Sequence, residues 1–226
     1  GIRIQDLLND EIFEKKVKQN VEDNNQLLTK IYNKNRLNPE EIIKEFEAYK
    51  NLISNHIKDT SLIISNAIKE NKNVLFEGAQ GTLLDIDHGT YPFVTSSNTS
   101  SGNAAIGSGV GPLNLDKIVG VTKAYISRVG SGPFITEQDN EIGDYLIEKG
   151  AEFGVVTGRR RRCGWLDLIS LKYSVRVNSL SELFITKLDV LSGLEEVNLC
   201  IGYQNGQEVI NDYPYEQKIL YNAKPV

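Results

Sequence analysis

The chain has 226 residues, of which 40% are hydrophobic and 24% are charged. This composition is that of a globular protein with one or two domains and excludes a disordered chain. The 30 acidic residues exceed the 25 basic ones, and the net charge of −5 gives no general attraction to nucleic acid or to anionic membranes. No apolar run approaches the roughly 20 residues that a membrane-spanning helix needs. Any anion site must therefore be a local cluster.

The cysteines and the two ends indicate the setting of the chain. Cys163 and Cys200 could form at most one disulfide, which favours a reduced, cytoplasmic compartment. The chain opens Gly1-Ile2-Arg3 without an initiator methionine or a leader, and it stops at Val226 without a helix cap or a charged tail. We therefore expect a piece of a longer protein.

The first part of the chain is predicted to be helical. Between residues 5 and 70, apolar side chains recur at three- and four-residue steps, as they do on the buried face of a helix. The second helix has a start signal: Asn38 can cap the free amides, Pro39 suits the first helical position, and Glu41 completes a capping box. We expect residues 1–72 to form a helical subregion that flanks the rest of the molecule.

The sequence pattern changes at Asn73. The apolar run Val74-Leu75-Phe76 predicts a short strand, and it leads into the glycine turn Glu77-Gly78-Ala79-Gln80-Gly81, the kind of place where α/β proteins bind ligands. We expect residues 73–226 to form one α/β domain with a central, mostly parallel sheet flanked by helices. Its further predicted elements are a long loop over 82–112, a strand over 118–129, helices over 142–148 and 166–177, a buried strand over 183–186, and a hairpin of 197–203 with 208–210.

The densest positive feature is Thr157-Gly158-Arg159-Arg160-Arg161-Arg162. Guanidinium groups bind carboxylates and phosphates through two hydrogen bonds at once, and the neighbouring glycines let the backbone approach an anion closely. A solvated turn and a nucleic-acid patch are the alternatives. We favour a small anionic ligand, because the rest of the chain is acidic and no aromatic side chains are interleaved with the arginines.

A second candidate site is Thr186-Lys187-Leu188-Asp189, at the end of the predicted buried strand. A carboxylate there can accept the N1 and N2 hydrogens of guanine while the lysine stem packs over the ring, and adenine cannot form that pair of bonds. A strand end closed by an ion pair would give the same four residues, so this segment alone leaves both interpretations open.

Other motifs favour structural roles. The glycines between Gly102 and Gly111 are not followed by Gly-Lys-Ser or Gly-Lys-Thr, so they do not form a Walker A loop. Asp85, Asp87 and His88 are too close together for a convincing metal site, and turn or capping roles are favoured for the two carboxylates. Two histidines offer no basis for a Ser/His/Asp triad.

Together these segments resemble the adenylosuccinate synthetase family, whose members join IMP to L-aspartate at the expense of GTP in purine biosynthesis. Residues 74–98, from Val74 to Asn98, are similar to the central signature of that family almost residue for residue. Residues 158–167 and 186–193 resemble two further conserved blocks in the same order. The resemblance covers essentially the whole chain, as an internal segment of a protein about twice as long.

The resemblance implies a role for particular residues. Gln80 would hydrogen-bond hypoxanthine, Leu84 would pack on the base, Thr95 would contact the IMP phosphate, and backbone near Val129 would contact the ribose. Val156 stands where the family usually has a threonine, which removes one hydroxyl contact to aspartate. The remaining implied residues bind aspartate (Val155, Val156, Thr157, Gly158, Arg159, Arg160 and Arg161, with Arg159 also at the IMP ribose) and GTP (Arg161, Lys187, Leu188 and Asp189).

The resemblance also implies what this chain lacks. It places the catalytic aspartate, which is a Mg²⁺ ligand, and the catalytic histidine in an amino-terminal phosphate loop and the segment after it, outside residues 1–226. No catalytic residue and no metal ligand is therefore expected in this chain, and these residues alone are expected to be inactive. A homodimer is implied as well. The alternative function is a fragment that binds IMP or guanine nucleotide without turning it over.

Overall fold

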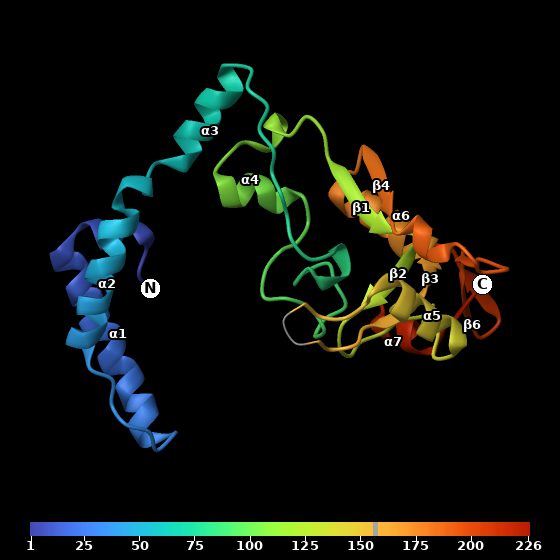
Figure 1. Ribbon diagram of the computed structural model, residues 1–226, viewed down its shortest axis with the longest axis horizontal. Coiled ribbons are helices and arrows are strands. Elements are labelled where there is room, and N and C mark those ends of the chain that lie inside the picture. Colours follow the sequence, from blue (N-terminus) through green and yellow to red (C-terminus); the bar gives the residue numbers. More distant parts are fainter. Residues whose placement is uncertain (156–157) are drawn as a thin grey trace. The chain divides into compact units, whose positions relative to one another are not determined.

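The computed structural model describes residues 1–155 and 158–226. It divides into two compact units, Gly1–Ile63 and Ile64–Val226, which are described separately. The boundary falls within helix α3 (Thr60–Lys69), shown in Figure 1. Within the described parts of the chain, no helix has both the length and the apolar character needed to cross a membrane. The predicted division at residues 72 and 73 stays a prediction.

The first unit contains the helices that the sequence predicts. A 3₁₀ helix (Ile4–Leu8) precedes α1 (Asp10–Lys30) and α2 (Pro39–Ile53), and a second 3₁₀ turn (Ser54–His56) follows. The predicted start of α2 is confirmed, since the Asn38 side chain accepts a hydrogen bond from the amide of Glu40 at 3.0 Å and Pro39 opens the helix. The predicted capping box is not formed, because Glu41 accepts from the Asn38 side chain at 3.3 Å and not from its backbone amide.

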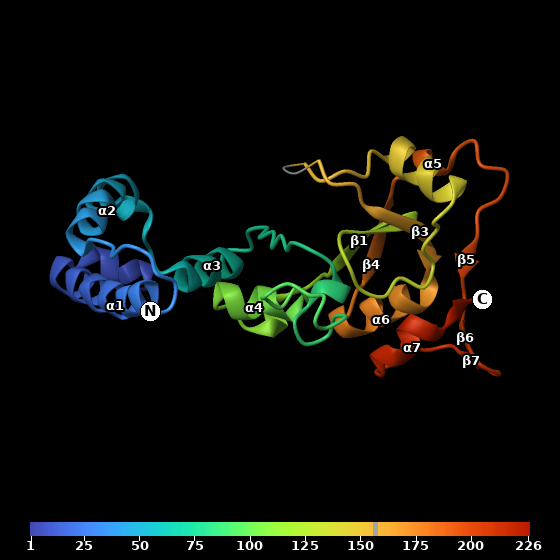
Figure 2. The same cartoon turned by 90° about the horizontal axis from the view of Figure 1, so that it is seen from below.

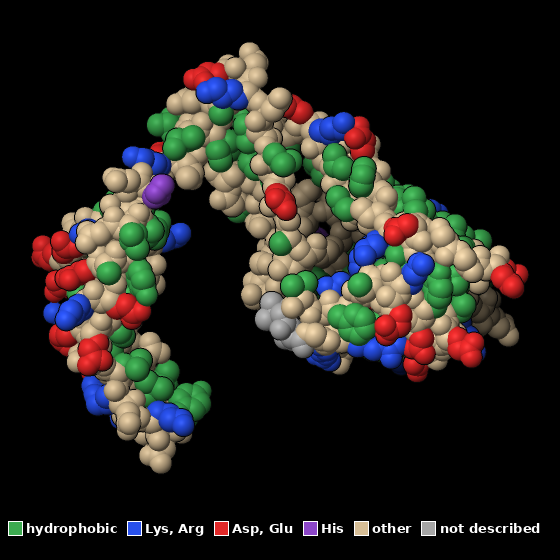
Figure 3. Space-filling view, viewed as in Figure 1, with side chains coloured by type: hydrophobic (Ala, Val, Ile, Leu, Met, Phe, Trp, Pro, Cys, Tyr) green, Lys and Arg blue, Asp and Glu red, His purple; other side chains and the backbone are tan. Residues whose placement is uncertain are grey.

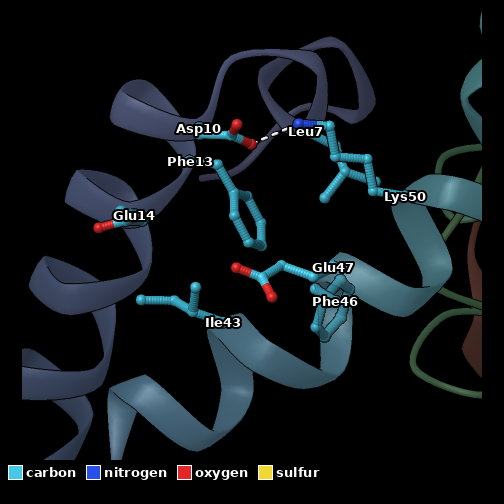
Figure 4. A pocket seen from close by; sticks show the side chains of 8 residues that line it. All are labelled: Leu7, Asp10, Phe13, Glu14, Ile43, Phe46, Glu47 and Lys50. Carbon is cyan, nitrogen blue, oxygen red and sulfur yellow. Dashed lines mark hydrogen bonds and ion pairs between the residues drawn. The ribbon is translucent and has the colours of Figure 1, made fainter.

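Apolar side chains of α1 and α2 form the core of the first unit. Phe13 of α1 and Ile43 of α2 line a pocket of about 10 Å³, and Figure 4 shows their side chains between the two helices. The small space that is left indicates that the side chains of the two helices pack against each other. The buried core residues are Leu7, Phe13, Val17, Val21 and Ile43.

The second unit has an α/β fold, as the sequence predicts, but its described strands lie in three small sheets and not in one central sheet. One sheet is a parallel pair, one is mixed and one is antiparallel. The parallel pair is β1 (Val119–Lys123) with β4 (Glu182–Thr186); the mixed sheet orders β2 (Tyr125–Arg128), β3 (Arg162–Asp167) and β5 (Leu199–Cys200); the antiparallel sheet orders β7 (Glu208–Ile210), β6 (Tyr203–Asn205) and β8 (Lys224–Pro225).

Helices of this unit cover both faces of the mixed sheet. In Figure 2, α5 (Glu141–Gly150) lies on one side of β3, and α6 (Leu168–Asn178) and α7 (Gln217–Asn222) lie on the other. Two buried clusters match this layering. One joins Tyr125, Leu146, Ile147, Cys163 and Val190, and the other joins Ile169, Cys200, Tyr203 and Leu220.

Several predicted elements need correction. Val74-Leu75-Phe76 is not a strand, because no described strand pairs with it, and Leu75 is 90% exposed. The predicted strand over 118–129 is two strands, since the chain changes its pairing partner at Ala124. The segment over 82–112 contains helix α4 (Gly102–Ser108).

Two further corrections concern the segments near the arginines and the guanine candidate. The helix predicted from residue 166 begins at Leu168, because 162–167 form strand β3 and Asp167 caps α6 through the amides of Ile169 and Ser170. Strand β4 is largely exposed and not buried, because its described pairing partner is β1 alone. Apolar composition indicated a strand there correctly but gave its burial wrongly.

Candidate functional site

The second unit contains a cleft of about 1240 Å³. Its walls come from segments that lie far apart in the sequence, including 74–84, 99–104 and 115–135. The space is more than enough for a nucleotide-sized ligand. Four residues that the sequence analysis selects line it: Gln80, Leu84, Val129 and Arg161.

The loop that carries Leu84 and Thr95 is organised around one buried carboxylate. Asp85 accepts hydrogen bonds from the amides of Asp87, His88, Thr99 and Ser100 and from the Asn98 side chain, at 2.7–3.1 Å. Burial raises the pKa of Asp85, but these donors outweigh it and hold the pKa well below its ordinary value. The favoured turn role of Asp85 is confirmed.

Thr95 lies beside Leu84 although it does not line the cleft. The amide of Thr95 donates to the carbonyl of Leu84 at 2.8 Å. Gln80, in the glycine turn before this loop, has a left-handed backbone with φ of 62°. Three of the residues selected for IMP therefore lie in one short, bonded stretch of chain.

A second buried carboxylate, Glu152, organises the far side of the site. It is 1% exposed and accepts hydrogen bonds from Lys123 at 2.6 Å, from the Tyr125 hydroxyl at 2.5 Å and from Arg161 at 2.8 Å. Burial raises the pKa of Glu152, but these three donors outweigh it and hold the pKa at about 2. The carboxylate is thus charged at neutral pH and fixes two cations in place.

The arginine segment is bound to carboxylates at three points. Arg160 pairs with Asp144, Arg161 with Glu152, and Arg162 with Glu137.

Within the same segment, Gly158 has φ of +64° and its amide donates to the Gly154 carbonyl at 2.8 Å, while Gly154 donates to the carbonyl of Arg159 at the same distance. Val155 is exposed. The selected residues Val156 and Thr157 lie outside the described residues.

Arg161 keeps one donor that the described residues do not satisfy. Its Nε is buried and has no hydrogen-bond partner among them, while Nη1 binds Glu152. A buried N–H without a partner is costly and rare for a residue that only stabilises the fold. This favours the ligand-binding interpretation of the segment over the solvated turn.

The guanine candidate lies outside the cleft lining. Lys187, Leu188 and Asp189 are exposed, and Lys187 has φ of 62°. The Lys187 ammonium donates to the carbonyl of Gly150 at 2.9 Å, at the end of α5. Lys187 and Arg161 are therefore both held by the short segment from Gly150 to Glu152.

The face of the second unit that is visible in Figure 3 gives no support to nucleic-acid binding. Acidic and basic side chains are interspersed over the visible face of the second unit in Figure 3. A nucleic-acid site is typically a continuous basic patch or stripe.

The sequence patterns do not select Lys123, Arg128, Glu152 and Asp167, all of which line the cleft or bind residues that do. Lys123 and Arg128 interrupt apolar strand residues, which is the one signal that could have selected them. Glu152 follows the glycine that ends α5, and its sequence context is unremarkable for a helix end. Asp167 would have been found by a correct helix start.

The similarity to known proteins extends over the whole chain. Residues 1–226 match the family model of adenylosuccinate synthetase. The chain belongs to the adenylosuccinate synthetase family. Its relatives include the adenylosuccinate synthetases of Frankia alni, 50% identical, and Halothermothrix orenii, 51% identical, each covering 100% of this chain and 53% of the relative.

A solved structure leads to the same family. That of fully ligated adenylosuccinate synthetase from Plasmodium falciparum superimposes with a TM-score of 0.91 at 41% identity, covering 100% of this chain and 53% of that one. The chain thus spans about half the length of the adenylosuccinate synthetases it matches.

Proposed function

We propose that this chain supplies the IMP-, aspartate- and guanine-binding residues of a GTP-dependent ligase that forms adenylosuccinate in purine biosynthesis. The observation that carries the proposal is the cleft, which brings Gln80, Leu84, Val129 and Arg161 together in a member of the adenylosuccinate synthetase family. These residues come from three separate segments, and a shared cleft is what a common ligand requires.

IMP is bound by the wall that contains the glycine turn. The Gln80 side chain has an amide that can donate and accept along the hypoxanthine edge, and Leu84 offers an apolar surface to the ring. Thr95 donates its hydroxyl to the phosphate, and the exposed Val129 presents backbone to the ribose. The hydrogen bond from the Thr95 amide to the Leu84 carbonyl keeps these two residues together, and Asp85 fixes the loop around them through its amide donors.

Aspartate and the GTP phosphates are bound by the arginine segment. Residues 155–161 hold the amino acid, with Arg159 reaching both aspartate and the IMP ribose. Arg161 lines the cleft and has the unsatisfied Nε, so it suits a phosphate oxygen. Phosphoryl transfer depends on positioning and charge stabilisation, and fixed guanidinium groups supply both.

The guanine base is recognised by Lys187, Leu188 and Asp189. The exposed Asp189 carboxylate accepts the N1 and N2 hydrogens of the base. The Lys187 stem covers the ring, and the hydrogen bond from its ammonium to the Gly150 carbonyl fixes the side chain in place. This assignment makes the ligase selective for GTP.

Magnesium does not fit the residues described. They contain no group of three or more His, Cys, Asp or Glu side chains that could hold a metal ion. We therefore assign Mg²⁺ to none of them and derive no step through it. Two predictions remain. The metal ligands and the catalytic aspartate and histidine are expected in other parts of the complete enzyme, and this enzyme is expected to be a homodimer.

Titration calorimetry with IMP tests the cleft assignment. We expect the chain to bind IMP and Gln80→Ala to weaken the affinity about tenfold, the value of roughly one good hydrogen bond to the base. Gln19→Ala, on the exposed face of α1, is the matched control and should leave the affinity unchanged. Equal affinities of the wild type and Gln80→Ala would contradict the assignment.

Turnover distinguishes the ligase from the alternative, a non-catalytic binder. Adenylosuccinate formation from IMP, aspartate and Mg-GTP is followed by absorbance, for this chain and for a polypeptide that spans the full length of the family and includes it. We expect product from the longer polypeptide. IMP binding without product from the longer polypeptide would favour the alternative.

A further inference from the structure

Two arginines share the carbonyl groups of one turn. Arg162 donates from Nη1 to the carbonyls of Gly130 and Gly132, at 3.1 and 2.9 Å. Arg128 donates to the other two carbonyls of the turn, from Nε to Ser131 at 3.2 Å and from Nη1 to Pro133 at 3.3 Å. Four successive carbonyls thus point to the two guanidinium groups alternately. This turn directly follows Val129.

Arg128 also binds the loop that carries Leu84 and Thr95. Its Nη2 donates to the Thr90 hydroxyl at 2.8 Å and to the Phe93 carbonyl at 3.2 Å. Thr90 is 2% exposed, and its amide donates to Leu83. One guanidinium group therefore joins the loop that carries Leu84 and Thr95 to the turn that follows Val129.

The glycine at the centre of the turn fits this arrangement. Gly132 has φ of +112°, and a Cβ there would clash with Nη2 of Arg128 and lie 3.0 Å from Cβ of Phe93. The turn and the loop are therefore in contact around the arginine, and the absence of a side chain at Gly132 leaves the guanidinium its place.

The surroundings of Arg128 are unusual for a residue that only stabilises the fold. Arg128 pairs directly with Arg162 across strands β2 and β3. Arg162 has the Glu137 carboxylate as partner, whereas in the described parts of the chain Arg128 has only carbonyl and hydroxyl acceptors. Burial, and then the charge of Arg162, lower the pKa of Arg128. A like-charged cross-strand pair is unfavourable. The hydrogen bonds that Arg128 makes must therefore offset this repulsion, and they account for its position.

We propose that Arg128 is a positioning residue that sets the spacing between the two segments that bind IMP. It acts through the acceptors of Thr90 and Phe93 on one side and of Ser131 and Pro133 on the other. The inference rests on the proposed function, because that function assigns Leu84, Thr95 and Val129 to IMP. Lysine could not replace Arg128, since an ammonium group lacks the planar guanidinium fork that reaches both segments.

Arg128→Lys tests the inference with two measurements on the whole chain. IMP affinity, by titration calorimetry, should fall about tenfold or more. Hydrogen exchange should speed up in residues 89–95 and 129–133 together, because one side chain holds both. Arg36→Lys, an exposed arginine of the first unit that pairs with Glu22, is the matched control and should change neither. Wild-type IMP affinity in Arg128→Lys would overturn the inference.

Thr90→Val is the second variant, and it removes an acceptor of Arg128 without changing charge. We expect about a threefold loss of IMP affinity, and no further loss when it is combined with Arg128→Lys, because both changes break the same link. Additive losses would overturn the inference. If Arg128→Lys does not fold, Thr90→Val alone decides, and a wild-type IMP affinity in that variant would overturn the inference.

The exchange measurement separates this inference from the proposed function. If the wild type does not bind IMP, the assignment of the cleft to IMP fails. Faster exchange in both segments of Arg128→Lys would still support the link between them, and faster exchange confined to one segment would refute it.

Discussion

Glu152 carries a charge in a position that is almost completely buried. Its two cationic partners, Lys123 and Arg161, are themselves more than two-thirds buried. A buried carboxylate is tolerated only when it is paired and hydrogen-bonded, and removing one partner of such a group costs several kcal/mol. Glu152 therefore affects both the stability of the fold and the site, because the same buried carboxylate also holds Arg161 at the cleft.

Glu152→Gln should lower the free energy of unfolding by roughly 3 kcal/mol at neutral pH. The pH dependence should change as well. The folded pKa of about 2 lies below the ordinary value of 4.5, so the contribution of this carboxylate is complete above pH 4.5 and is lost as the pH falls toward 2. Urea unfolding between pH 2 and 7 measures this contribution, which should be missing in Glu152→Gln.

Glu148→Gln is the control, since Glu148 is exposed on α5 and its substitution should leave the stability near that of the wild type. An acid-induced loss of stability that is equal in the wild type and in Glu152→Gln would contradict this account of the carboxylate.

The residues of the site were predictable to the extent that their chemistry shows in local sequence. The arginine segment and the glycine turn that contains Gln80 are short, dense and unusual, so they could be selected without a structure. Glu152 could not, because its importance arises from partners that the fold brings to it, and for Arg128 the sequence offers only its place among apolar strand residues. A single carboxylate or guanidinium gives no sign in the sequence of which distant segments it will bind.

At the scale of secondary structure, local signals predicted helices better than strands. The cap and the first turn of α2 are set by Asn38 and Pro39, which are neighbours in sequence. Strand pairing depends on distant segments. The apolar run over 118–129 therefore indicated extended chain but not that β1 pairs with β4 while β2 pairs with β3.

One asparagine joins three elements of the second unit. Asn178, the last residue of α6, accepts a hydrogen bond from the Ser101 amide at 2.8 Å and donates to the Thr82 hydroxyl at 3.0 Å. Ser101 precedes α4, and Thr82 opens the 3₁₀ helix (Thr82–Leu84) that carries Leu84. Asn178 is 7% exposed, so water does not readily replace it.

Asn178→Ala should lower the free energy of unfolding by about 2 kcal/mol, because it leaves buried donors and acceptors without partners. Hydrogen exchange should increase in α4 and in residues 82–84, while β6 and β7 stay protected. Asn222→Ala is the matched control, since Asn222 is an exposed residue at the end of α7 whose side chain donates to the Lys218 carbonyl within its own helix. Unchanged protection of α4 in Asn178→Ala would refute the link.

At the scale of the whole molecule, the sequence correctly predicted a helical segment followed by an α/β segment. It did not predict how the strands divide into sheets. Strand count and composition fix the fold class, but sheet topology depends on which edges meet. The exposed apolar residues of the β1–β4 pair, including Val121 and Phe184, belong to a parallel sheet, and parallel sheets are typically covered on both faces.

Each unit has its own apolar core, and this predicts separate responses to core mutation. In the first unit, Phe13 is 6% exposed and its ring lies 5.8 Å from that of Phe46. Phe13→Ala should destabilise this unit by about 3 kcal/mol, the usual cost of removing a buried aromatic ring. Leu52→Ala, at a side chain that is 73% exposed, is the control and should change stability by less than about 0.5 kcal/mol.

Hydrogen exchange of the full chain decides the outcome, because it reports each unit separately. In Phe13→Ala, the amides of α1 and α2 should lose protection while those of β2 and β3 keep it, since Tyr125 and Cys163 lie in a cluster built from residues of the second unit. The IMP affinity should also stay at the wild-type value, because every residue that lines the cleft belongs to the second unit. Loss of protection in both units would show that they unfold together, and the stability of the cleft would then depend on the helical unit.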